Sequence, residues 1–433
     1  MGVREKLHAL RKDPLLVNTA MLYLLSFSNA LLTFVTQGYL TRIVGIGRIG
    51  ILGAARYTTN FFQLFIDFGF ILSATAKVSR RREDKAYLSR TLTCVVGAKL
   101  LFMLTSSCIL LVFILPGVGE DPGAALAYWS YLLYVCMVAL LPDFIYRGLE
   151  RMKEIAVKAV LIKIVATLLV FVAVRQPGDY WLSPLLSALG NAGATAFVYW
   201  HLKKRLGIWF CRVSLREIFR EMKEGAQFFL SNVAMAVNTN LNGVLLKNLS
   251  GALATGLYTQ ADVVITAARG AMTPIADSLY ANTVHTRNFK VIRKTLLTLY
   301  PVVLAGCVFV FFAAPWLLTA WLGPEAGPQS VLPLRLLLPV AVFAFPNYLL
   351  GYPPLSPIGL TKHANLAVAF GTGVYLVGLL VCWVTVGIRL ESLCVLSSLT
   401  EFSILAYRVV IVLRNRHLFQ PEHPTPALEE EED

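Results

Sequence analysis

Apolar stretches of about 20 residues or more recur along the chain from Leu15 to Arg414, with short polar joints between them, and we count about twelve. One membrane-spanning helix needs about 20 apolar residues, so twelve such helices fill almost the whole chain. The composition agrees, because 57% of the residues are hydrophobic and only 15% are charged. The sequence therefore predicts an all-α polytopic membrane protein with about twelve transmembrane helices.

Most of the 39 Lys and Arg residues lie at alternate ends of successive apolar stretches. The basic joints are residues 1–14, 77–90, 147–158, 203–223, 287–294, 362 and 414–416. The opposite joints hold only Arg42, Arg48, Arg175, Lys247 and Arg389. Because basic loops stay in the cytoplasm, both termini are predicted to be cytoplasmic. The net charge of +14 then faces anionic lipid, and a nucleic-acid partner is not expected.

The longest basic joint divides the chain into two halves of six predicted helices each. We expect a cytoplasmic N-terminus (1–14), an N-lobe (15–202), a linker (203–223), a C-lobe (224–415) and a disordered acidic tail (416–433). The linker is amphipathic, which predicts a helix lying on the inner membrane surface. A faint repeat relates the halves: Gly50, Leu52, Tyr57, Thr58 and Gly69 match Gly251, Leu253, Tyr258, Thr259 and Gly270 at a constant offset. A parallel repeat of this kind is known in transporters.

Charged and polar residues also occur well inside the predicted helices. A central charge that faces lipid costs at least about 2.5–3.5 kcal/mol, so these side chains should face the bundle interior or an aqueous cavity. Helical spacing places Arg56, Asn60, Gln63 and Asp67 on one face of the second helix, and similar stripes follow the first, seventh and eighth helices. These stripes predict a hydrated cleft between the lobes. The competing interpretation is that the polar side chains only pack between helices, and it suits the Ser and Thr positions better when each is taken singly.

We therefore predict two sets of functional residues in the cleft. The residues expected to contact a substrate are Arg56, Lys99, Lys163, Arg269, Asn60, Gln63, Asn29 and Thr266. The residues expected to bind a coupling ion are Asp67, Asp262 and Glu401. The seven cysteines include no C-x-x-C pair and the six histidines no H-x-x-x-H pair, so neither a disulfide framework, a metal site nor a cofactor is expected.

Several motifs resemble those of one known family. The segment Ile66-Asp67-Phe68-Gly69-Phe70-Ile71-Leu72-Ser73-Ala74-Thr75 is similar to the D-F-G-F-x-x-S-A-T signature of bacterial O-antigen and polysaccharide flippases. Looser matches are Gly47-x-x-Gly50, Phe61-Phe62, Ser278-Leu279-Tyr280, and Asn347, Gly351 and Pro357-Ile358-Gly359. This family belongs to the multidrug/oligosaccharidyl-lipid/polysaccharide (MOP) exporter superfamily. The resemblance implies two six-helix lobes in a V and a cavity arginine on the eighth helix, where Arg269 lies.

The resemblance also implies a function, which is not enzymatic. The chain would flip an undecaprenyl-pyrophosphate-linked oligosaccharide across the bacterial inner membrane by alternating access. H⁺ and Na⁺ are the candidate coupling ions for the acidic residues, and a polysaccharide polymerase and glycosyltransferases of the same pathway are candidate partners. The first alternative is a multidrug or cation antiporter of the same fold, which would require a cavity dominated by acidic and aromatic residues. A membrane polymerase or ligase is a further alternative, but the predicted outer joints are short and hold no histidine.

The predicted orientation can be tested with alkaline phosphatase fusions, because this enzyme is active only outside the cytoplasm. Fusions at Gly119 and Gly178, in predicted outer joints, should be active. Fusions at Arg82 and Arg205, in basic joints, should be inactive. Active fusions at Arg82 and Arg205, with inactive fusions at Gly119 and Gly178, would mean that the orientation is the reverse of the predicted one.

Overall fold

The computed structural model describes residues 31–118, 121–151, 153–286 and 289–419, and every regular element within these ranges is a helix. Seven helical stretches in this part of the chain are long and apolar enough to cross a membrane. They are Ile46–Arg80, Lys85–Gly117, Pro122–Gly148, Phe289–Leu322, Val331–Leu355, Thr361–Thr385 and Leu390–Arg414. The chain is therefore a multi-pass, all-helical membrane protein, as the sequence predicts.

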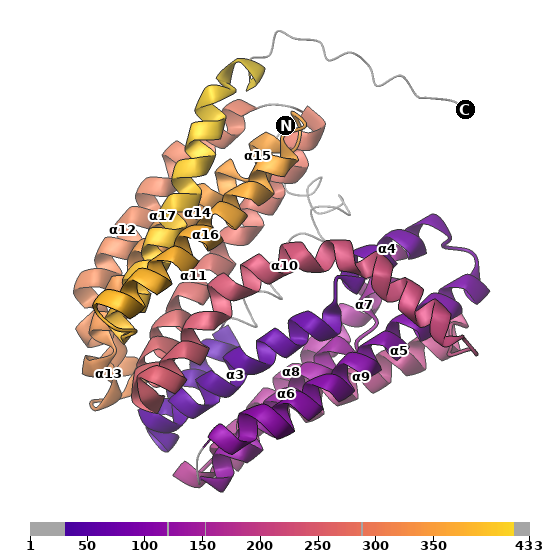
Figure 1. Ribbon diagram of the computed structural model, residues 1–433, viewed down its shortest axis with the longest axis horizontal. Coiled ribbons are helices and arrows are strands. Elements are labelled where there is room, and N and C mark those ends of the chain that lie inside the picture. Colours follow the sequence, from indigo (N-terminus) through magenta and orange to yellow (C-terminus); the bar gives the residue numbers. More distant parts are fainter. Residues whose placement is uncertain (1–30, 119–120, 152, 287–288, 420–433) are drawn as a thin grey trace, which may run out of the picture.

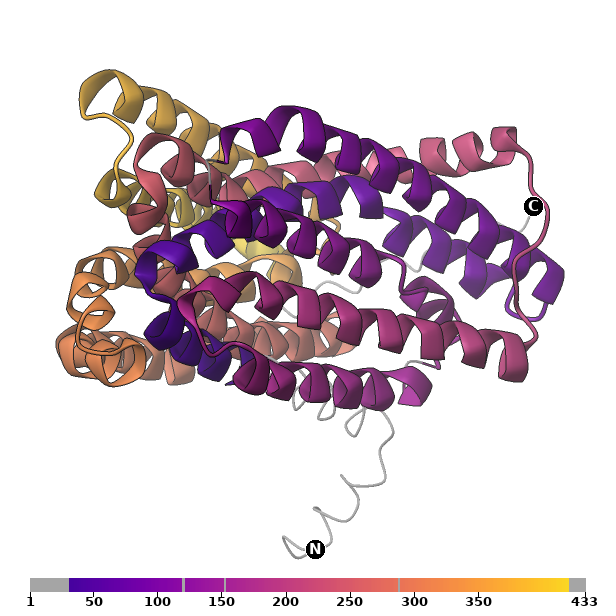
Figure 2. The same cartoon turned by 90° about the horizontal axis from the view of Figure 1, so that it is seen from below.

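The helices form two groups, which meet at one end and diverge at the other (Figure 1). The first group contains residues 31–44, α3 (Ile46–Asp67), α4 (Phe70–Arg80), α5 (Lys85–Ile109), α6 (Pro122–Ala139), α7 (Asp143–Gly148), α8 (Lys153–Ala173) and α9 (Leu182–His201). The second contains α10 (Leu215–Leu249), α11 (Gly251–Thr286), α12 (Phe289–Leu322), α13 (Ala326–Gln329), α14 (Val331–Leu350), α15 (Tyr352–Leu355), α16 (Thr361–Thr385) and α17 (Leu390–Arg414). From below, the long helices of the first group run roughly parallel to the longest axis (Figure 2). This is the predicted V of two lobes.

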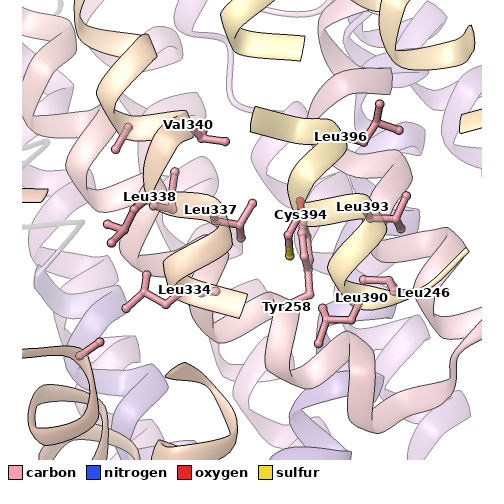
Figure 3. Close-up of a cluster of buried hydrophobic side chains, with 14 of the residues drawn as sticks. Leu246, Tyr258, Leu334, Leu337, Leu338, Val340, Leu390, Leu393, Cys394 and Leu396 are labelled. Carbon is pink, nitrogen blue, oxygen red and sulfur yellow. The ribbon is translucent and has the colours of Figure 1, made fainter. Parts of the chain in front are cut away.

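The C-lobe is held together by a core between its four inner helices, α10, α11, α14 and α17. Leu246 of α10 and Tyr258 of α11 meet leucines and valines of α14 and α17 there (Figure 3). The outer faces are different, because α12 and α16 expose large apolar side chains such as Phe312, Trp316 and Trp383. Exposed apolar side chains on a long helix are the expected surface toward lipid.

The lobes meet where α3 and α11 begin, and glycines allow their backbones to touch. A Cβ atom added at Gly50 would lie 1.7 Å from the carbonyl oxygen of Ala252, and one at Gly256 would lie 2.2 Å from that of Ile46. Such close approach of small residues is typical of tight helix pairs in membranes. The rings of Tyr57 and Tyr258 follow along the seam, with centroids 6.0 Å apart. The helices that carry the sequence repeat are thus direct neighbours.

The first helix adds a second contact across the same end. The indole of Trp321, on α12, stacks on Phe34 with ring centroids 4.0 Å apart and donates a hydrogen bond to the Phe34 carbonyl (3.0 Å). The guanidinium of Arg42 donates to the carbonyls of Ala320 and Trp321. The seam is therefore closed on the side that the Lys/Arg distribution assigns to the exterior, and the lobes diverge on the side assigned to the cytoplasm.

The second predicted helix is not continuous, which corrects its prediction as a single helix. Phe68 (φ 38°) and Gly69 (φ 77°) adopt left-handed conformations, and they separate α3 from α4. Glycine is the residue best suited to this conformation. The ring of Phe68 packs on Phe102 and on Phe229 of α10, with centroids 4.8 Å and 4.7 Å apart. The D-F-G-F motif is thus a helix break that contacts α10.

The linker also differs from its prediction as a separate surface helix. Residues from Leu215 onward are the first turns of α10, which is continuous to Leu249 and begins at a capping box of Ser214 and Glu217. The apolar side chain of Ile218 packs on the N-lobe, close to Gly97 of α5. Ion pairs join Arg90 to Glu217 (2.6 Å) and Lys77 to both Glu221 (2.7 Å) and Glu224 (2.6 Å). Since α10 begins on one lobe and ends in the other, it connects them physically.

These contacts have a local electrostatic effect at the start of α10. The pKa of Glu217 lies below its ordinary value, because its carboxylate accepts the backbone N–H of Ser214 and also pairs with Arg90. The ionised form at neutral pH favours the helix N-terminus, where the helix dipole is positive.

The closed seam predicts a disulfide that locks the lobes. A Cβ atom at Gly53 would lie 3.2 Å from the Cβ of Thr259, near the separation of about 3.5–4.5 Å that disulfides adopt. The Gly53→Cys/Thr259→Cys variant is made in a background without the seven native cysteines and is then oxidised. After proteolytic cleavage between the lobes, the two fragments should migrate together on gels as one crosslinked species. Each single variant is the control. Absence of the crosslink would mean that α3 and α11 do not meet in the membrane.

Candidate functional site

A cavity of about 940 Å³ lies between the lobes, at the upper end of the range for ligand-binding sites. Its walls come from α3, α4, α10, α11, α14, α16 and α17, with Thr33 from the first helix. Polar side chains on the wall include Thr33, Asn60, Gln63, Asn238, Thr239, Asn240, Thr266, Ser397 and Thr400. The polar stripes that the sequence indicates thus meet around one space, because the lobes bring their helices face to face.

Arg56 and Asp262 form an ion pair across the two lobes. The Arg56 Nη2 atom lies 3.3 Å from Asp262 Oδ2, and the Tyr57 hydroxyl donates to the same oxygen at 2.8 Å. Arg56 also lies over the Tyr57 ring, 4.9 Å from its centroid. Both charged side chains keep about a quarter of their surface exposed to the cavity (27% and 25%). They are therefore paired, yet open to a ligand.

Arg269 and Glu401 form a second pair, within the C-lobe, from α11 to α17. The guanidinium of Arg269 donates to Glu401 Oε1, and the amide of Asn347 on α14 donates to Glu401 Oε2 at 2.9 Å. The side chains of Arg269 and Glu401 are 26% and 20% exposed. The carboxylate is thus held from two sides, by a cation and by a neutral amide.

Asn347 is a site residue that the sequence pattern alone did not single out. It is 2% exposed, and its backbone carbonyl accepts a hydrogen bond from buried Arg408. In the sequence, Asn347 stands out only as part of a loose family match. A signal was present, since an asparagine beside Pro346 inside an apolar helix needs polar partners.

Asp67 lines the cavity, but Lys99 does not. The Lys99 ammonium is 3% exposed and donates to Asp67 Oδ1 (3.1 Å) and to the carbonyl of Ala139 (2.6 Å), on the N-lobe side of the cavity wall. The expected substrate contact of Lys99 is therefore not made here; its charge stabilises Asp67 instead. Periodicity did not reveal this pair because the two residues lie on different helices.

Of the remaining predicted residues, Asn60, Gln63 and Thr266 line the cavity. The amide of Asn60 donates to the side-chain oxygen of Asn240 across the lobes, at 2.9 Å. The side chain of Lys163 and the whole of Asn29 lie outside the described residues. Among described residues, no group of three or more His, Cys, Asp or Glu side chains is placed to hold a metal ion.

The described cavity wall carries fewer basic side chains than the four that the sequence predicts. Among the described residues, two arginines (Arg56, Arg269) and three carboxylates (Asp67, Asp262, Glu401) line it. Each of these carboxylates has a cationic partner, and the two arginines are engaged by Asp262 and Glu401. An anionic ligand would have to exchange with these carboxylates to reach the arginines.

Comparison with known proteins places the chain among transport-related sequences. Residues 15–280 match the family model described as "Polysaccharide biosynthesis protein". A protein of Escherichia coli (strain K12) named "Putative O-antigen transporter" is 24% identical over 269 residues, which are 61% of this chain and 63% of that protein. A protein of Shigella dysenteriae with the same name is 24% identical over 320 residues, 71% of this chain and 78% of its own length.

Two solved structures share the fold. An inward-facing multidrug resistance MATE family transporter of the MOP superfamily is 16% identical, with a TM-score of 0.66 over 92% of this chain and 98% of its own. The lipid II flippase MurJ, in an inward closed conformation, is 11% identical, with a TM-score of 0.67 over 91% and 87% of the two chains. At these identities the likeness establishes a MOP-type fold.

The Arg269–Glu401 pair predicts a compensating double variant. Arg269→Ala should lower the thermal unfolding midpoint, because Glu401 loses its cation while remaining largely desolvated. The cost should fall below the about 3–5 kcal/mol of a fully buried broken pair, since a fifth to a quarter of both side chains is exposed. Arg269→Ala/Glu401→Ala should recover most of the loss, measured by thermal unfolding in detergent. A double variant less stable than Arg269→Ala would contradict the pairing.

Proposed function

The chain belongs to the polysaccharide biosynthesis protein family, and on that basis we propose that it is a flippase for a lipid-linked oligosaccharide. The substrate is an undecaprenyl-pyrophosphate-linked repeat unit of O-antigen, capsule or exopolysaccharide. It crosses the bacterial inner membrane by alternating access, and both termini of the protein are cytoplasmic. The observation that carries this proposal is the interlobe cavity, in which two arginines, each paired with a carboxylate, lie among neutral polar side chains.

The chemistry of such a substrate matches the cavity. A pyrophosphate cannot enter hydrocarbon unaided, because desolvating an unpaired charge costs far more than burying a neutral polar group. Arg56 and Arg269 would bind its oxygens, for which the planar guanidinium fork is well suited. The sugars would meet the neutral amides of the wall, such as Asn60 and Gln63. The polyprenyl tail would stay in lipid, between the diverging lobes.

The carboxylates supply a way to load and release the substrate. Asp262 and Glu401 pair with the two arginines, so pyrophosphate binding would be an exchange of anions. Binding of H⁺ or Na⁺ at Asp262 or Glu401 would neutralise a carboxylate and free an arginine for the phosphate, whereas binding at Asp67 would release Lys99. The transport cycle would then be coupled to an ion gradient.

The Arg56–Asp262 pair also connects this exchange to lobe movement. It joins α3 to α11, just inside the glycine contacts that close the seam. When pyrophosphate takes Arg56 from Asp262, one interlobe bond is lost near the closed end. A ligand shifts a conformational equilibrium only through such a difference in its binding to the two states.

One observation favours the alternative, a drug or cation antiporter of the same fold. Carboxylates outnumber arginines among the described residues of the cavity wall. For the antiporter, the expected phenotype is export of lipophilic cations and resistance to them. For the flippase, the expected phenotype is surface polysaccharide. Glycosyltransferases would supply its repeat unit before the flippase acts, and a polymerase would consume that unit afterwards.

We predict that Arg56→Ala and Arg269→Ala each reduce surface polysaccharide strongly, while the protein stays in the membrane. One charge-assisted hydrogen bond contributes about 1.5–3 kcal/mol, so losing an arginine should lower affinity about 10- to 100-fold. Arg269→Lys should restore part of the export, since the charge remains but the fork is lost. The measurement is surface glycan in cells that lack the chromosomal copy.

The Arg269→Ala/Glu401→Ala variant is the matched control for this experiment. It removes the same arginine but leaves no unpaired carboxylate, so loss of export in this variant would point to the missing side chains of Arg269 and Glu401 rather than to loss of stability. Normal surface glycan in both Arg269→Ala and the double variant would restrict Arg269 to a packing role. Sensitivity to lipophilic cations, with normal glycan, would favour the antiporter.

A further inference from the structure

A second cavity, of about 490 Å³, lies inside the N-lobe. Residues 31–44 and helices α3, α6, α8 and α9 enclose it, with Thr259 of α11 at one edge. It adjoins the interlobe cavity, because Thr33, Arg56, Asn60 and Gln63 line both spaces. The two cavities therefore share a stretch of wall that includes Arg56, and the proposed function above assigns no role to the space of the N-lobe cavity.

The lining of the N-lobe cavity is polar but nearly uncharged. Among the described residues that line it, Arg56 is the single charged one, and none carries a carboxylate. Hydroxyls come from Thr36, Thr167, Ser183 and Ser187, and amides come from Gln37 and Asn191. Asn191 is 7% exposed, a cost in a membrane unless its amide is hydrogen-bonded. Its Nδ2 atom donates to the Ser187 carbonyl at 2.8 Å, which leaves the carbonyl end of the amide for another partner.

Two tyrosines of α6 complete the wall. Tyr131 and Tyr134 pack edge to face, with ring centroids 6.4 Å apart, and both line the cavity. Each ring offers an apolar face and a hydroxyl, a combination that suits ligands with both apolar and polar surfaces.

We propose that the N-lobe cavity is a saccharide subsite: it holds a sugar unit of the transported glycan while the pyrophosphate lies against the arginines of the interlobe cavity. This inference rests on the proposed function. A sugar carries many hydroxyls that donate and accept, and apolar C–H faces that pack on aromatic rings. A cationic ligand would lack a carboxylate here, and a multiply charged anion would find only Arg56. The volume lies in the lower half of the usual range, which fits a short saccharide segment rather than a long chain.

The position of Arg56 explains how one substrate reaches both spaces. Its guanidinium faces Asp262 in the interlobe cavity, while Arg56, Asn60 and Gln63 also form part of the N-lobe cavity wall. A phosphate bound at Arg56 would therefore lie at the junction, with the glycan free to extend into the N-lobe. The two cavities would thus recognise different parts of the substrate. The interlobe cavity would bind the charged pyrophosphate, and the N-lobe cavity would bind the hydroxyl groups of the sugar.

The test uses single cysteines as reporters in purified full-length protein. The seven native cysteines are replaced, and Ser187→Cys reports on the N-lobe cavity while Thr266→Cys reports on the interlobe cavity. Labelling by a small uncharged maleimide is timed with two probes: the repeat-unit oligosaccharide released from its lipid, and inorganic pyrophosphate. The oligosaccharide should slow labelling of Ser187→Cys about tenfold, which corresponds to occupancy of about nine-tenths of the sites. Pyrophosphate should slow labelling of Thr266→Cys and leave labelling of Ser187→Cys unchanged.

A substitution in the N-lobe cavity adds a second readout. Asn191→Leu keeps the side-chain size but removes the amide, and should weaken oligosaccharide protection of Ser187→Cys about 5- to 20-fold, the effect of losing roughly 1–1.8 kcal/mol of hydrogen bonding. Pyrophosphate protection of Thr266→Cys should not change. Asn365→Leu, on α16 and outside both cavities, is the matched control.

The outcomes separate this inference from the proposed function. If pyrophosphate protects Thr266→Cys but the oligosaccharide leaves Ser187→Cys labelling unchanged, the saccharide subsite is rejected and the interlobe site stands. Equal protection of both positions by the oligosaccharide would also reject it, because the glycan would not be confined to the N-lobe. Failure of pyrophosphate at Thr266→Cys would instead remove the anion site on which the proposed function depends.

Discussion

The pairing of charges at membrane depth is the constraint on which the rest of this structure depends. An unpaired charge facing lipid is costly, so each deep arginine and lysine must find an anion, a carbonyl or water. Arg56 meets Asp262 across the lobes, Arg269 meets Glu401 within one lobe, and Lys99 meets Asp67. The first two pairs remain partly exposed to the cavity. They therefore satisfy the charges at rest and still leave them accessible to a competing anion.

Backbone contact at the seam decides which charges can pair. Gly50 and Gly256 bring α3 and α11 so close that any Cβ atom would clash, and this approach places Arg56 within reach of Asp262. At the other end the lobes diverge, and α10 bridges them by ion pairs to Arg90 and Lys77. The closed and the open end thus belong to one arrangement, in which movement of the lobes must change the polar contacts along α3, α10 and α11.

Two cavities with different chemistry follow from this arrangement. The space between the lobes carries the paired arginines and carboxylates, whereas the space inside the N-lobe carries hydroxyls, amides and two tyrosines, with Arg56 between them. A substrate with a charged and a neutral part would fit this division. Charge recognition between lobes responds to lobe movement, while a subsite within one lobe can keep its shape during the cycle. Specificity and movement would then be assigned to different residues.

The sequence by itself determined the class of fold and indicated the two halves and part of the cavity wall. The length of the apolar stretches and the helical spacing of Arg56, Asn60 and Gln63 depend only on local geometry, so both can be recognised in the sequence alone. Which charges pair was decided by tertiary structure, because Arg56 and Asp262, or Lys99 and Asp67, come from helices that periodicity cannot place side by side. The same holds for Asn347 and for the break at Phe68-Gly69, whose roles arise from contacts with distant helices. Spacing along one helix reveals a face; only packing reveals what that face meets.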